Sequence, residues 1–258
     1  MKSNNFSLEQ YLRRIGFDAP LSLDIECLAA VMRCQLFSIP FENLDVLSGA
    51  GISLNPEDIV KKLLGRGRGG YCYELNGLFG MFLDSLSVDY HFVAARPMFY
   101  PMRRPRTHMA IVAEVRGRSW LFDLGFGSYG VRAPLALDQL DVECRQDEDT
   151  FRLALAEDGD FLLQAKVAGE WSSQYAFADV SAEWIDFYPA NYLNSNHPDT
   201  IFVQKPVLII HRPEGRDMLV GSVLKNVRGG QFHEREIMPE EYEGVLKQVF
   251  GIDAFKAA

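Results

Sequence analysis

The sequence predicts an α+β protein, in which a helical N-terminal region precedes antiparallel strands and a closing unit of strands and one helix. Up to about residue 86, apolar residues recur at the three-and-four spacing of helices with one buried face. Beyond residue 87, short segments rich in β-branched and aromatic residues alternate with turn residues, as in antiparallel hairpins. The chain has 258 residues, of which 48% are hydrophobic, so it can bury a substantial core in one large or two to three small domains.

Start signals define four helices in the N-terminal region, over residues 8–15, 22–37, 59–64 and 72–86. Ser7 and Ser22 are expected to cap the first two helices. Asn55 followed by Pro56 begins the third. The fourth begins at Cys72, and its apolar residues lie on one face.

The strand signals are arranged mainly as hairpins, with strands at 90–100, 107–115, 118–123, 151–156 and 161–167 and turns at Arg116–Gly117 and Asp158–Gly159. Such hairpins suggest a barrel or a strongly curved sheet. A polar, aromatic stretch over 181–200 leads to the last unit. That unit is predicted to have strands near 207–211, 218–223 and 232–237, followed by a helix over 239–250.

Composition excludes several classes of function. The formal net charge of −9 argues against broad binding to nucleic acid or anionic lipid. No apolar run approaches the roughly 20 residues that cross a bilayer, and the N-terminus does not read as a signal peptide. We therefore expect a cytoplasmic protein with no membrane partner and with its four cysteines reduced. No C-x-x-C motif occurs, so no metal site is expected.

Basic residues are nevertheless concentrated in one loop, which holds Arg96, Arg103, Arg104 and Arg106 and ends before His108. Two interpretations remain open. The loop is either a solvated, solubilising segment or a site for an anionic small molecule.

A glycine-rich basic loop over residues 66–70 delivers Cys72 to the first turn of its helix. Unpaired backbone N–H groups and the helix dipole favour a thiolate at that position. Arg66 and Arg68 are expected to act in the same direction. Cys72 is thus a candidate nucleophile, whereas Cys27, Cys34 and Cys144 are interpreted as structural.

A thiol nucleophile needs a base and a group that orients the base, and His108 with Asp123 is the pair we predict. If the hairpin is centred on Arg116–Gly117, paired residues have numbers that sum to 233, and His108 and Asp123 are diagonal neighbours on one face. A loop one residue longer would put them on opposite faces. The alternative role of Asp123 is to cap a turn. His91, His197, His211 and His233 are interpreted as structural or solvent-facing.

Four separated motifs resemble those of the arylamine N-acetyltransferases. They are Ile39-Pro40-Phe41-Glu42-Asn43-Leu44, Arg68-Gly69-Gly70-Tyr71-Cys72-Tyr73-Glu74-Leu75-Asn76, Thr107-His108 followed by a strand, and Trp120-Leu121-Phe122-Asp123-Leu124-Gly125-Phe126-Gly127. The similarity extends from Tyr11 to about Phe202, and the order and spacing of Cys, His and Asp match the family triad.

The resemblance implies a helical bundle over residues 1–87, a central antiparallel β-barrel over 88–195 and a C-terminal α/β lid over 196–258. The triad would have a cysteine-protease-like arrangement, with Cys72 as the acetylated nucleophile, His108 as its base and Asp123 as the orienting carboxylate. Contacts with substrate or coenzyme A (CoA) are implied for Arg68, Thr107, Phe126, Gly127, Ser195 and Pro198. The last two belong to a segment over 191–200 that resembles one approaching CoA in some family members. The final region is shorter than in many relatives.

The implied reaction is a ping-pong transfer of the acetyl group of acetyl-CoA to arylamines and arylhydrazines, which include xenobiotics. Acetyl-CoA is then a cosubstrate, and no permanently bound cofactor is expected. Three alternatives remain open: an amide synthase of the same fold that closes a polyketide chain onto an aromatic amine, a cysteine hydrolase of the papain or transglutaminase kind, and a binding protein that keeps the triad without catalysis. The oligomeric state is not predicted.

Overall fold

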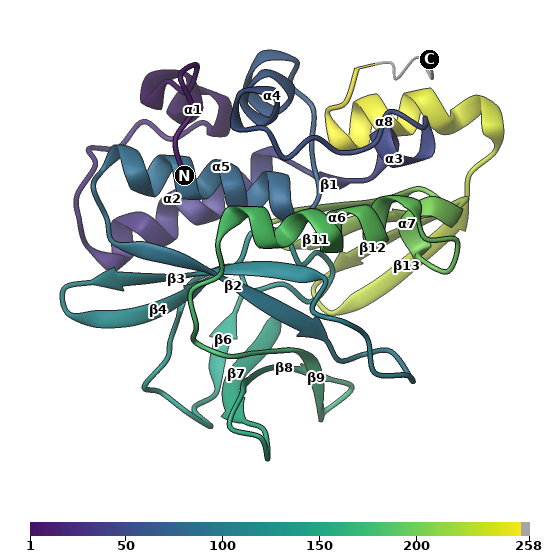
Figure 1. The fold of residues 1–258 in the computed structure, drawn as a ribbon. Coiled ribbons are helices and arrows are strands. Elements are labelled where there is room, and N and C mark those ends of the chain that lie inside the picture. Colours follow the sequence, from purple (N-terminus) through teal and green to yellow (C-terminus); the bar gives the residue numbers. More distant parts are fainter. Residues whose placement is uncertain (254–258) are drawn as a thin grey trace.

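A computed structural model describes residues 1–253 and confirms the predicted α+β class. Figure 1 shows α1, α2, α4 and α5 above an antiparallel sheet, with the C-terminal strands and α8 beside them. The helices are α1 (Leu8–Ile15), α2 (Ile25–Ser38), α3 (Leu44–Leu47), α4 (Pro56–Val60), α5 (Cys72–Ser85), α6 (Phe187–Asn196), α7 (Ile201–Gln204) and α8 (Tyr242–Phe250), with a π-helical turn at Lys61–Gly65 and 3-10 turns at Trp184–Asp186 and Pro239–Glu241.

The four predicted helices of the N-terminal region form, but their bounds differ and α3 was not predicted. The helix predicted over 59–64 is α4, capped by Asn55, followed by the π-helical turn at Lys61–Gly65. Ser7 caps α1 by accepting from the N–H of Gln10. The cap of α2 is Asp24 rather than Ser22, because the Asp24 carboxylate accepts from the N–H of Cys27 at 2.9 Å. The α5 helix buries every residue from 72 to 83 instead of one face, since it packs against β3 as well as against α1 and α4.

The central part of the chain forms a strongly curved, nearly closed barrel sheet, as predicted. Its strands follow the order β5-β4-β3-β2-β9-β8-β7-β6, and all neighbours are antiparallel. They are β2 (Tyr90–Pro97), β3 (His108–Val115), β4 (Arg118–Phe122), β5 (Leu135–Ala136), β6 (Cys144–Gln146), β7 (Asp149–Leu155), β8 (Phe161–Val167) and β9 (Glu170–Phe177). Strands β5, β6 and β9 were not predicted from the sequence.

The register of the β3–β4 hairpin is the one that the sequence predicts. Arg116 and Gly117 both have positive φ, at 51° and 75°, as a two-residue turn of this type requires. Ile111 pairs with Phe122, so paired numbers sum to 233. Strand β4 ends at Phe122, and Asp123 follows it directly.

The last unit is a five-stranded sheet in the order β1-β10-β11-β12-β13, covered by α8. Its strands are β1 (Phe41–Glu42), β10 (Val207–Arg212), β11 (Gly215–Val220), β12 (Val223–Arg228) and β13 (Gln231–Glu236). The strand predicted over 218–223 is wrong in its bounds, because the positive-φ residue Gly221 turns the chain there and separates two strands. Helix α6 lies in the stretch 181–200, for which no helix was predicted.

The N-terminal region contributes β1 to this last sheet. Strand β1 is the edge strand beside β10, and its Phe41 pairs with Ile209. The side-chain amide of Asn43 donates to the carbonyl oxygens of Phe202 and Lys205 at 2.7 and 2.9 Å, and its oxygen accepts from the N–H of Val207 at 2.7 Å. The segment that carries α7 is therefore fastened to the helical region.

The three-domain division stays a prediction. Its first boundary, 87/88, falls between α5 and β2, and its second, 195/196, falls within α6. Positions 254–258 of the predicted last domain lie outside the described residues.

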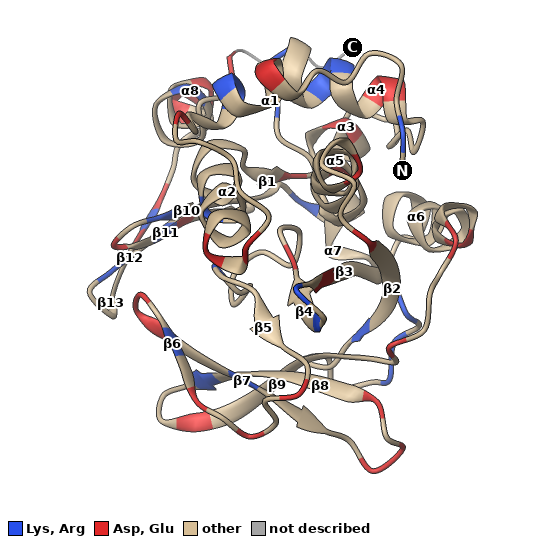
Figure 2. Ribbon diagram, turned by 90° about the vertical axis from the view of Figure 1, so that its left-hand side faces the viewer, with Lys and Arg blue, Asp and Glu red and all other residues tan. Residues whose placement is uncertain are grey.

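Among residues 1–253, no helix combines the length and the apolar composition needed to span a bilayer. Over the same part of the chain, no group of three or more His, Cys, Asp or Glu side chains is arranged to hold a metal ion. Figure 2 shows basic and acidic segments interleaved along the ribbon. Many of them pair, as Arg118 does with Asp138 at 2.5 Å and Lys225 with Glu234 at 2.8 Å.

A buried ion cluster supports the loop that leads to Cys72. Lys62 Nζ lies 2.8 Å from both Asp45 Oδ2 and Glu74 Oε1, and 3.8 Å from Glu42 Oε1. Arg68 Nη2 lies 2.6 Å from Glu42 Oε1. Burial alone would lower the pKa of Lys62, but the surrounding carboxylates outweigh it and raise that pKa. Lys62 is therefore charged, and it compensates Glu42 and Glu74, which are almost inaccessible to water, and the partly buried Asp45.

We expect Lys62→Met to lower the free energy of unfolding by about 3–5 kcal/mol, because it leaves the buried Glu74 carboxylate without its cation. Urea unfolding followed by circular dichroism measures this loss. Lys61→Met, at the exposed neighbouring position, is the matched control and should change stability by less than about 0.5 kcal/mol. Equal losses in the two variants would contradict a stabilising role for the cluster.

Candidate active site

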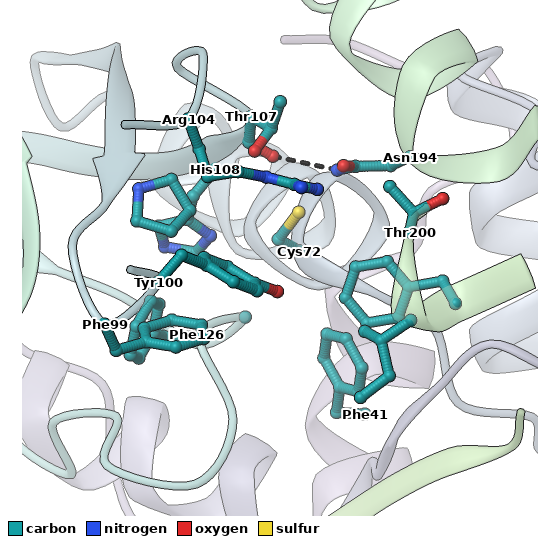
Figure 3. A pocket seen from close by; sticks show the side chains of 14 residues that line it. Phe41, Cys72, Phe99, Tyr100, Arg104, Thr107, His108, Phe126, Asn194 and Thr200 are labelled. Carbon is teal, nitrogen blue, oxygen red and sulfur yellow. Dashed lines mark hydrogen bonds between the residues drawn. The ribbon is translucent and has the colours of Figure 1, made fainter. Parts of the chain in front are cut away.

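A cleft opens between the start of α5, the β2–β3 loop, the segment after β4, and the α6–α7 region. Its volume is about 520 Å³ when the part open to solvent is included. Figure 3 shows Cys72 between an aromatic side, with Phe99, Tyr100 and Phe126, and a second side with Phe41, Asn194 and Thr200. The other lining residues are Pro97, Arg104, Thr107, His108, Gly125, Ile201 and Phe202.

Cys72 is the first residue of α5 and is 4% exposed. The residue before it, Tyr71, is the N-cap, and its N–H donates to the Glu74 carboxylate at 3.0 Å. Gly125 passes so close that a Cβ there would lie 2.4 Å from the Cys72 Cα. Only glycine therefore permits this approach of the segment after β4 to the first turn of α5.

Burial raises the pKa of the Cys72 thiol, and the negative charge of Asp123 raises it further. Hydrogen bonds from the backbone N–H groups of Tyr73 and Met109 act in the opposite direction but do not outweigh burial. The expected stabilisation of a thiolate by the helix start and two arginines is therefore outweighed by burial. Arg68 instead directs its guanidinium to Glu42. The thiol needs a proton acceptor in the cleft.

His108 is the imidazole that lines the same cleft as Cys72. Its Nε2 lies 2.7 Å from Asp123 Oδ2, and the two side chains are 5% and 0% exposed. The second carboxylate oxygen of Asp123 accepts from the N–H of Gly125 at 2.9 Å and from the amide of Asn76 at 3.1 Å. The predicted register thus brings histidine and acid together, with the other ring nitrogen left for the cleft.

Asn76 connects the helix of the cysteine with the strands of the histidine and the acid. It lies one turn after Cys72, and its amide donates to the Met109 carbonyl at 2.7 Å as well as to Asp123. Its oxygen accepts from the N–H of Leu124 at 2.9 Å. One buried side chain therefore fixes α5 relative to β3 and to the segment after β4.

The start of β3 is held from two further sides. The carbonyl oxygen of Thr107 accepts from the hydroxyl of Tyr73 and from the amide of Asn194, both at 2.9 Å. Figure 3 shows the bond from Asn194. These bonds restrain the backbone next to His108.

Two rings pack against His108. The ring centroids of Phe126 and Tyr175 lie 5.1 and 5.0 Å from that of His108, and 5.0 Å from each other. Burial and the nearby charge of Asp123 raise the pKa of Tyr175, so its hydroxyl stays protonated. These rings limit the orientations that the imidazole can adopt.

Not all residues that the resemblance implies for substrate or CoA line the cleft. Thr107 and Phe126 belong to its lining. The Ser195 hydroxyl donates to the carbonyl of Asn191 at 2.7 Å, and Pro198 is exposed. Gly127 has a φ of 91° and lies against Ile209. Arg68 is in the ion cluster described above.

Lining or supporting residues that were not predicted include Phe41, Asn76 and Tyr175. Asn194 and Thr200, which line the cleft, belong to the segment 191–200 that the resemblance placed near CoA, but they were not singled out within it. Phe41 and Asn76 lie inside quoted motifs, which was the signal available for them. The remaining histidines lie outside the lining of the cleft, and among them His91 pairs with Asp179 at 2.8 Å.

Comparisons with known proteins agree on one family. The model of the N-acetyltransferase family matches residues 24–257. The chain is 33% identical to the arylamine N-acetyltransferase of Mycolicibacterium smegmatis over 94% of this chain and 90% of that protein. It is 29% identical to the Escherichia coli enzyme over 95% and 88%, respectively.

Solved structures give the same result. The arylamine N-acetyltransferase of Mycobacterium abscessus superposes with a TM-score of 0.90 at 28% identity, covering 98% of this chain and 92% of that one. The enzyme of Mycobacterium marinum, solved in complex with CoA, superposes with a TM-score of 0.88 at 30% identity, covering 95% and 93%. With matching sequence, fold and length, the chain belongs to the arylamine N-acetyltransferases, a family of acyltransferase enzymes.

Proposed function

We propose that this enzyme transfers the acetyl group of acetyl-CoA to the nitrogen of arylamines and arylhydrazines through an acetyl-Cys72 intermediate. The observation that carries the proposal is that Cys72 and the His108 imidazole, paired with Asp123 at 2.7 Å, line one cleft. The CoA complex of the Mycobacterium marinum relative supports acetyl-CoA as the cosubstrate.

In the first half-reaction, His108 takes the proton of the Cys72 thiol. Its free ring nitrogen faces the sulfur in this proposal, because Nε2 is engaged by Asp123. The thiolate attacks the thioester carbonyl, a carbon–sulfur bond to Cys72 forms, and the bond to the CoA sulfur breaks. The CoA thiolate then takes the proton from the imidazolium.

In the second half-reaction, an uncharged aromatic amine attacks the acetyl carbon. His108 accepts a proton from the amine nitrogen, the bond from carbon to the Cys72 sulfur breaks, and the proton returns to the sulfur. Asp123 stabilises the imidazolium in both steps, and its own charge is compensated by the donors from Gly125 and Asn76.

We expect acetyl-CoA alone to add one acetyl group to the wild-type protein, on Cys72, and an arylamine to remove it as the N-acetyl product. Intact-mass spectrometry with peptide mapping measures both steps. Cys72→Ala should give no adduct, whereas Cys144→Ala, which changes a cysteine outside the cleft, should acetylate normally. If water removes the acetyl group as fast as the amine does, the hydrolase alternative is indicated. If the wild-type protein forms no acetyl adduct, the proposal is contradicted.

His108→Gln should slow acetylation of Cys72 by about 10²–10⁴-fold, because the buried thiol loses its proton acceptor. The same change should move alkylation of Cys72 by iodoacetamide to higher pH. The sign follows from burial, which raises the pKa of the thiol and leaves it protonated at neutral pH when no base is present. Site-resolved alkylation against pH measures the shift, with Cys27 as the internal control. Identical profiles for Cys72 in both proteins would remove His108 from the mechanism.

Gly125→Ala should lower the acetylation rate by about 100-fold, because the added Cβ must displace the first turn of α5 or the segment after β4. Gly244→Ala, in α8 with open space around its Cα, is the control and should leave the rate unchanged. The measurement is stopped-flow acetylation, with circular dichroism to verify the fold. A wild-type rate in Gly125→Ala would show that the close approach is dispensable.

A further inference from the structure

The basic loop between β2 and β3 contains one arginine that differs from its neighbours. Arg96 donates to the carbonyl oxygen of Arg104, Arg103 lies 3.9 Å from Asp158, and Arg106 lies 2.8 Å from Asp160. Within residues 1–253, no hydrogen bond or ion pair of the Arg104 guanidinium occurs, so no acidic side chain there pairs with it directly.

Arg104 is also the arginine of this loop that lines the cleft. Figure 3 shows its side chain reaching into the cleft near Cys72. Its Cζ lies 4.7 Å from the ring centroid of Tyr100, and the side chain is half-buried. The ring restrains the guanidinium and takes part of it out of water, while leaving its hydrogen-bond donors unused.

The cleft has a second property that limits its ligand. Its aromatic side consists of Phe99, Tyr100 and Phe126, with Phe99 and Phe126 5.9 Å apart between centroids. A planar aromatic ring can pack on this side while a substituent reaches the guanidinium. A carboxylate is the group that matches a guanidinium best, because two parallel N–H···O bonds can form.

We infer that Arg104 is a specificity-determining residue that recognises an anionic substituent, a carboxylate, on the aromatic amine acceptor. The inference rests on the proposed function for the acceptor's chemistry. The ring carries its amino group toward the Cys72 sulfur and its carboxylate toward Arg104. The enzyme then prefers an aminobenzoate to the neutral ester of the same compound.

The test compares 4-aminobenzoate with its methyl ester, which presents the same ring and amino group without the charge. In Arg104→Gln, the ratio of kcat/KM for the acid to that for the ester should fall by roughly 10- to 100-fold, as expected for loss of hydrogen bonds to a charged group. Arg104→Lys should restore part of the ratio, since it keeps the charge but not the planar fork. Arg103→Gln, at an exposed position of the same loop, should leave the ratio at the wild-type value.

Two further measurements distinguish failure of this inference from failure of the proposed function. The phosphates of CoA are the other anions that could meet Arg104, and acetylation of Cys72 by acetyl-CoA in the absence of amine reports on them. If Arg104→Gln slows that step and leaves the acid-to-ester ratio unchanged, the inference is overturned. Calorimetric titration of benzoate into the unacetylated protein tests the site without turnover. Weaker binding in Arg104→Gln than in wild type supports the inference even if no acetyl adduct forms, and equal binding overturns it.

Discussion

The contact between the first turn of α5 and the end of the β3–β4 hairpin is the constraint on which the rest of the site depends. Gly125 lies against the Cys72 backbone, and Asn76 donates to one strand and to the carboxylate that follows the other. A helix and a sheet from different parts of the chain are thus fixed in one orientation. The positions of sulfur, imidazole and carboxylate follow from that orientation and from the register of one hairpin.

The local features of the fold could be predicted because each has a local cause. The two-residue turn with positive φ at Arg116 and Gly117 fixes the register, and from it the proximity of His108 to Asp123 follows. The Ser7 cap and the helix that begins at Cys72 are similar cases. The hairpin pattern predicted a barrel or a strongly curved sheet, and the family motifs added the cosubstrate, which no periodicity in the chain would reveal.

What the sequence did not reveal depends on contacts between distant segments. The position of Cys72 at a helix start suggested a stabilised thiolate with a lowered pKa. The burial of α5 on all sides and the charge of Asp123 instead raise the pKa of the thiol. Arg68 lies close to Cys72 in sequence, yet two carboxylates of the N-terminal region hold its guanidinium. Asn194 comes from a segment that the resemblance placed near CoA, but the segment has little helical periodicity, and only the folded chain shows that this side chain lines the cleft.

The pairing of β1 with β10 also bears on how the protein acquires its site during synthesis. Phe41 and Phe202, whose rings lie 5.7 Å apart, both line the cleft, and the partner strand of Phe41 is translated long after the helical region has left the ribosome. A nascent chain that already contains Cys72, His108 and Asp123 therefore still lacks one wall of the cleft. The cleft is therefore complete only once the last sheet has assembled, after most of the polypeptide is present.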